Sequence, residues 1–198
     1  MSGSLPPSSP AAPLLALKAA VQERLRLAFP ATAFSHGVVP YRLTPAAWER
    51  LTARTPFVGL GFGGLRATTA GGDARAFSGD ARWSVFLVAR NPVADALLAG
   101  AASGAGAATP GLLRMAGAAL AALHGVTFAG LGTARVDGVQ NMAGDNWGGE
   151  DTGVLLLDLA VPVVLDDDDA GAVLDDFLAL AVEWASHPPA ADVVTLEH

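Results

Sequence analysis

The sequence contains no cysteine and only one lysine, Lys18. The absence of cysteine excludes a disulfide scaffold, cysteine-ligated zinc and thiol catalysis. Lys18 does not follow a glycine-rich loop, so a P-loop nucleotide site is excluded as well. Long apolar runs are also missing: stretches such as Met115–Leu123 fall well short of the ~20 residues that a membrane-spanning helix requires. Residues 1–13 lack the basic and apolar regions of a secretory signal, so we expect none.

Charge is scarce and unevenly distributed along the chain. Charged residues make up 16% of the 198 residues and hydrophobic ones 52%, a composition typical of a chain that buries a core. Residues 1–136 hold all 12 basic residues and 5 acidic ones, whereas residues 137–198 hold 14 acidic residues and no basic one. This asymmetry fits either compositional drift within one domain or an acidic part that faces a basic surface of another copy or partner. The acidic total argues against nonspecific duplex binding.

Hydrophobic periodicity predicts an α/β domain of the α+β type. We expect a sheet built around a long antiparallel β-hairpin; that the sheet is mixed, mainly antiparallel, with helices packed on one side of it, is what the family resemblance described below implies. The predicted helices are 13–29, 45–53, 110–124 and 170–186, with a weak helical turn at 93–99. The predicted strands are an irregular edge strand at 34–43, the hairpin of 57–66 and 80–90, a strand near 133–139, and 152–165.

Residues 152–165 carry apolar side chains on both faces, which predicts a central strand covered on both sides. Pro162 lacks an N–H group, so one side of this strand's far end should be unpaired or bulged. In the hairpin, Gly59 and its alternate neighbours form a glycine face, which predicts close packing against the backbone. We expect Leu120 of the 110–124 helix and Leu157 of the central strand to be buried.

The candidate motifs do not predict catalysis, a cofactor or a metal. Residues 59–64 match G-x-G-x-x-G, but a turn and a strand follow where a dinucleotide site needs a helix. Asp166–Asp169 are contiguous, which suits capping of the following helix better than calcium binding. Neither an H-E-x-x-H zinc motif nor a G-x-S-x-G elbow is present. We therefore expect no enzymatic activity.

The arginines of the hairpin are the strongest candidates for a binding surface. They either protect sheet edges or make a subunit contact. The subunit reading pairs them with acidic residues that follow residue 137. The candidate interface residues are Arg66, Arg75, Arg82, Arg90, Asp145, Glu150 and Asp151.

The order helix, long hairpin, helix, strand, loop and long strand resembles the Mu-like prophage family of small tail proteins, which are related to phage tail terminators. The resemblance covers about residues 13–165 and lies in element order and in apolar strands that end in Arg-Asn. The segments that carry it are Pro56–Phe62, Arg82–Arg90, Leu112–Leu123, Ala134–Asn141 and Gly153–Val164. The proline-rich start, the segment 34–53 and the acidic C-terminal helix depart from the family pattern.

This resemblance implies a structural protein that is not an enzyme. It would form a ring, usually of six copies, that caps the tail tube and joins it to the neck. Its partners would be itself and the tail tube and neck proteins. No membrane and no sequence-specific nucleic acid is expected, although DNA would pass through the ring. The location implied is the host cytoplasm during assembly and then the virion tail.

Three regions are expected: a disordered segment 1–12, a single tail-terminator-like domain 13–190, and a tail 191–198. The tail's last three residues resemble an expression-tag scar. A competing hypothesis is a small-ligand or metal-binding accessory domain that uses the loop 137–151. A third is a different neck or baseplate component on a similar fold.

Overall fold

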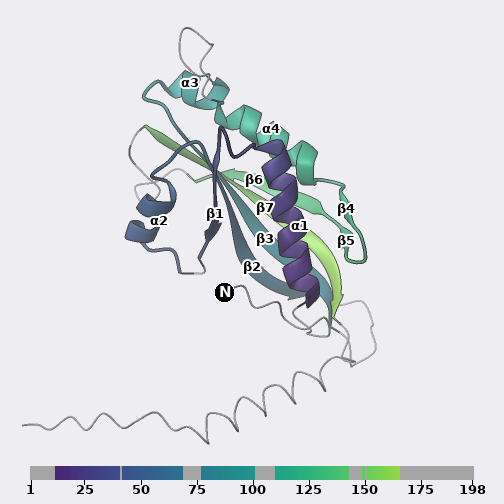
Figure 1. The fold of residues 1–198 in the computed structure, drawn as a ribbon. Helices are drawn as coiled ribbons and strands as arrows, with labels where there is room; N and C mark the ends of the chain where they lie inside the picture. The colour runs from purple at the N-terminus through teal and green to yellow at the C-terminus, as the bar shows by residue number, and fades with distance from the viewer. Residues whose placement is uncertain are drawn as a thin grey trace, which may run out of the picture.

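A computed structural model describes residues 12–40, 42–68, 77–100, 110–142, 149 and 151–165 (Figure 1). The helices are α1 (Ala12–Ala28), α2 (Pro45–Leu51), α3 (Ala94–Ala99) and α4 (Leu112–Leu123). The strands are β1 (Ser35–Val39), β2 (Phe57–Ala67), β3 (Phe77–Arg90), β4 (Thr127–Phe128), β5 (Gly132–Thr133), β6 (Arg135–Asn141) and β7 (Thr152–Leu165). The segment 1–11, the aspartates 166–169, the expected helix 170–186 and the tail 191–198 lie outside the described residues.

Five strands form one sheet in the order β1-β2-β3-β7-β6. β1 runs parallel to β2, and the other neighbours are antiparallel, which confirms the expected mixed, mainly antiparallel sheet with its long β2–β3 hairpin. β7 pairs with β3 along its whole length and with β6 only as far as Ala160. Pro162 therefore lies past the end of β6, where its missing N–H leaves no gap in that ladder.

Helices α1 and α4 cover one face of the sheet and enclose the main core (Figure 1). α1 buries a stripe at helical spacing, which consists of Leu17, Val21 and Leu25. From the sheet, alternate residues of β3 and β7 enter the same core, including Leu157, which is 0% exposed. The burial predicted for Leu157 is thus confirmed.

The burial predicted for Leu120 is wrong. Leu120 is 36% exposed, whereas Met115 and Ala119 are buried. α4 is apolar around most of its circumference, so its sequence does not define which stripe faces the sheet. The small side chain of Ala119 lies on the buried side of α4, and the larger Leu120 is left at the edge.

Helix α2 packs against the opposite face at one end of the sheet. Thr44 caps it by accepting a hydrogen bond from the backbone N–H of Ala47 at 3.2 Å, and Pro45 starts it, as the sequence predicts. Trp48 of α2 forms a second core with Phe86 of β3 and the buried ring of Phe57. On the N-terminal side of Phe86, β3 presents the polar and charged side chains of Ser84, Arg82 and Asp80 on this face. Helix α2 therefore covers only part of this face.

Candidate functional site

Four charged side chains meet on the sheet face that α2 leaves uncovered. Arg82 of β3 and Arg135 of β6 both lie opposite Ala160 of β7, one on each side. A β-bulge between Val136 and Gly138 brings Asp137 beside both arginines, and each donates a hydrogen bond to its carboxylate. Asp80 accepts from Arg135 Nη2 at 3.3 Å and lies 3.9 Å from Arg82 Nη2. We call these four residues the ion-pair cluster.

Each charged side chain of the ion-pair cluster has partners of opposite charge within the cluster. The hydrogen bond from Arg135 is the main cause that lowers the pKa of the Asp137 carboxyl, and Arg82 acts in the same direction. In return, the hydrogen bond and the charge of Asp137 raise the pKa of the Arg135 guanidinium. Arg82, which the sequence suggests as a subunit contact, thus already has two partners in its own chain.

Removing the Asp137 charge should weaken the fold at neutral pH and not in acid. Because the pKa of Asp137 is lower in the folded protein, its contribution is complete above the ordinary value of 3.8 and is lost as the pH falls through the folded-state value. Asp137→Asn should lower the free energy of unfolding by less than about 1 kcal/mol at pH 6, as is typical of surface pairs. Urea unfolding at pH 6 and pH 3 measures this, and an equal loss at both would contradict it.

Of the remaining predicted interface residues, those that the structure describes do not form one patch. Arg66 is exposed and lies opposite Asp80, near the ion-pair cluster. Arg90 lies at the other end of β3, where its Nε donates to Thr152 Oγ1 at 3.1 Å. Asp151 accepts from the same Thr152 hydroxyl at 3.1 Å, so Arg90 and Asp151 share one corner of a single chain. Arg75, Asp145 and Glu150 lie outside the described residues.

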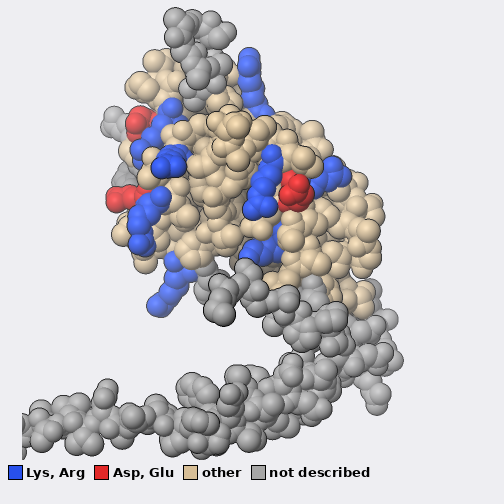
Figure 2. Space-filling view, viewed as in Figure 1, with Lys and Arg blue, Asp and Glu red and all other residues tan. Residues whose placement is uncertain are grey.

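Basic side chains are spread over the face of the molecule that carries α1, with few acidic ones among them (Figure 2). The described residues as a whole hold 11 basic and 7 acidic residues, whereas residues 166–198 hold 9 acidic residues and no Lys or Arg. The charge asymmetry of the sequence is therefore carried by a basic folded part and an acidic C-terminal segment.

A groove runs between α1 and the strands β1 and β2. It consists of two adjoining hollows of about 230 and 420 Å³, both of which are lined by Val38 and Leu60. We call it the α1 groove. Its larger end is apolar and is lined by Leu14, Leu15, Lys18, Val38, Val39, Pro40, Leu60, Phe62 and Trp83.

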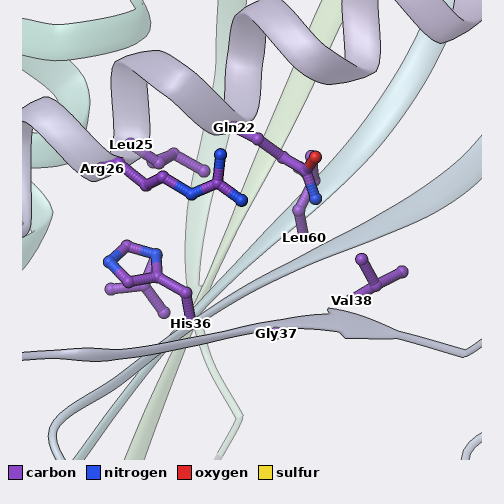
Figure 3. Close-up of a pocket in the computed structure, with 8 residues that line it drawn as sticks. Gln22, Leu25, Arg26, His36, Gly37, Val38 and Leu60 are labelled. Carbon is purple, nitrogen blue, oxygen red and sulfur yellow. The ribbon is translucent and has the colours of Figure 1, made fainter. Parts of the chain in front are cut away.

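The smaller end of the α1 groove is polar. Gln22 and Arg26 extend from α1 over the opening, and His36 rises toward them from β1 (Figure 3). His36 Nε2 donates to the backbone carbonyl of Phe29 at 2.6 Å, which holds the ring beside α1. Arg26 lies 3.9 Å from Glu23 on the exposed side of the helix. This end carries no acidic lining residue.

Sequence reasoning missed the α1 groove. Its walls come from a helix and two strands whose separation cannot be read from periodicity. The one available signal was the pair Leu14 and Leu15, because adjacent leucines cannot both face the same core.

No protein-family model matches this sequence, and no curated protein matches it. Within the part of the chain that the structure describes, no group of three or more His, Asp or Glu side chains is placed to hold a metal ion. Most of the loop proposed as an alternative ligand site, including Asp145 and Glu150, lies outside that part. Among the described helices, none is long and apolar enough to cross a membrane.

Proposed function

We propose that this protein is a structural component of a phage or prophage tail, namely a tail terminator. Six copies would form a ring that caps the tail tube and joins it to the neck. The observation that carries the proposal is the architecture around the long β2–β3 hairpin, where helices cover one face and a charged area lies open on the other. Such a surface suits contact with another protein better than chemistry on a small molecule.

The charge distribution supports self-association of the kind that closes a ring. In a head-to-tail ring, one surface of each copy meets a different surface of the next, so the two surfaces can carry opposite charge. The described residues are basic on balance and the C-terminal segment is acidic. On this proposal the protein has no catalytic turnover and no cofactor, and DNA passes through the ring without being read.

The partners follow from the same proposal. Besides other copies of itself, the ring would contact the tail tube on one side and neck proteins on the other. Assembly would take place in the host cytoplasm, and the protein would remain in the virion tail.

Reversing the exposed arginines of the hairpin should weaken self-association. Arg82 is a poor choice for this test, because a glutamate there would add a third carboxylate beside Asp80 and Asp137. Arg66 and Arg90 are exposed, and Arg66→Glu combined with Arg90→Glu should shift the oligomer toward monomers. Each exposed pair is worth only ~0–1 kcal/mol, so the loss of two pairs should raise the dissociation constant of the contact by about thirtyfold or less.

Sedimentation velocity at low and high salt measures this shift, since a Debye length near ~8 Å at physiological salt screens exposed charges. Arg114→Glu is the matched control, because Arg114 is equally exposed but lies on α4, away from the hairpin. Circular dichroism verifies that both variants fold. An oligomer that tolerates both the hairpin reversal and high salt would mean that its contact is not electrostatic.

A further inference from the structure

We propose that the α1 groove is the docking site for residues 170–186 of the same chain. The proposal does not depend on the ring: with 170–186 docked in its own chain, the acidic residues of the C-terminal segment left to face a neighbouring copy are those at 166–169 and beyond 186. It rests on the surface of the groove, on the sequence of the segment, on their charges and on the length of chain that joins them.

At the apolar end of the α1 groove, three large hydrophobic side chains are exposed next to one another. Leu15 is 44% exposed, Val38 49% and Phe62 43%, and all three line the same hollow. At its floor, Trp83 is 5% exposed and its indole Nε1 has no hydrogen-bond partner. Contiguous apolar surface of this kind usually marks a place where another segment binds.

The segment 170–186 has the sequence that such a groove accepts. Its apolar residues at positions 173, 177, 180, 181 and 184 recur at helical spacing, and Leu174, Leu178 and Val182 widen the same apolar face. A helix with one apolar stripe binds a hydrophobic groove through anchors spaced in this way. Residues 1–11, the other segment near this end of the molecule, offer only Met1 and Leu5 as large apolar side chains. The C-terminal segment is therefore the better occupant.

The charges of the two parts are complementary. The α1 groove has Lys18 at its apolar end and Arg26 at its polar end, and no acidic residue lines either hollow. Between its apolar residues, the segment carries Asp175, Asp176 and Glu183 and no base. An acidic amphipathic helix in the groove would thus place apolar surface on apolar surface and carboxylates beside cations.

The segment 170–186 follows β7 closely in the chain, and β7 ends near the α1 groove. β7 ends at Leu165, at the end of the molecule where α1 begins (Figure 1). The apolar end of the α1 groove starts at Leu14, in the first turn of α1. The four aspartates 166–169 span up to about 13 Å when extended. Because only four residues join the segment to β7, docking within the chain is favoured over docking on a second copy.

Cross-linking of paired cysteines in the full chain tests the proposal directly, because the natural sequence has no cysteine. Leu15→Cys combined with Phe177→Cys should give mostly an intramolecular bond under mild oxidation at low protein concentration. The control combines Leu113→Cys with Phe177→Cys, because Leu113 is 62% exposed on α4 and does not line the groove. Intact mass and a non-reducing gel distinguish bonds within a chain from bonds between chains.

Dye binding gives a second readout that needs no cysteine. Phe177→Asp should uncover the α1 groove and raise the fluorescence of a hydrophobic dye such as ANS several-fold. Ala179→Asp adds the same charge outside the apolar stripe and should leave it unchanged. Cross-links that form only between chains would overturn docking within one chain in favour of a second copy. Equal cross-linking of both cysteine pairs, or no change in dye binding, would overturn the proposal altogether.

Discussion

Leu157→Ala is expected to lower the free energy of unfolding by about 2–5 kcal/mol. Leu157 lies in β7, an interior strand next to the edge of the sheet, between Val85 of β3 and Val139 of β6, and its side chain is fully buried in the main core. The loss combines the transfer free energy of the deleted atoms with the cavity that the rigid sheet leaves behind. Urea unfolding monitored by circular dichroism measures it.

Leu120→Ala provides the matched control, since it deletes the same atoms at a half-exposed position. Little cavity forms there, and alanine has the higher helix propensity, so we expect a loss below about 1 kcal/mol. If the two variants were equally destabilised, the assignment of the buried stripe of α4 would be wrong.

Gly59→Ala is expected to lower the free energy of unfolding by about 1–3 kcal/mol, although it adds only one methyl group. A Cβ at this position would lie 2.8 Å from Phe57 Cε1 and 2.8 Å from Val39 Cγ2. Both side chains are buried in the second core, so neither can move without disturbing its neighbours.

Gly117→Ala is the opposite case and serves as its control. Gly117 lies within α4, and a Cβ there would meet nothing within 4 Å. The methyl group should therefore raise the free energy of unfolding by roughly 0.5–1 kcal/mol, because alanine loses less backbone entropy in a helix. Thermal melts of both variants measure the difference. A neutral or stabilising Gly59→Ala would contradict the close packing of β1 on β2.

Much of the fold could be predicted because local patterns and tertiary packing agree. The bounds of β7 follow from a run that is apolar on both faces, and the start of α2 follows from Thr44 and Pro45. The glycine face of β2 is explained at Gly59, where the ring of Phe57 in the same strand and a methyl group of Val39 in β1 occupy the space of a side chain. In each case a local feature of the sequence is compatible with only one structure at that position.

The candidate sites were harder to predict, because they depend on which distant residues become neighbours. Asp137 pairs with Arg82, 55 positions earlier, only because a bulge in β6 and the register of β7 bring them together. The sequence suggested Arg82 as a free cation for another copy, and no local pattern indicates its partner. Likewise, the α1 groove depends on how far the helix stands from β1, which periodicity does not determine.

The mass and shape of the full chain at high concentration test the proposed function most directly. Light scattering gives the mass, and negative-stain images of the same sample give the shape. We predict a closed ring of six copies, with a central opening wide enough for DNA. A chain that remains monomeric at every concentration, or that forms only compact dimers without an opening, would contradict the proposal that it assembles as a ring.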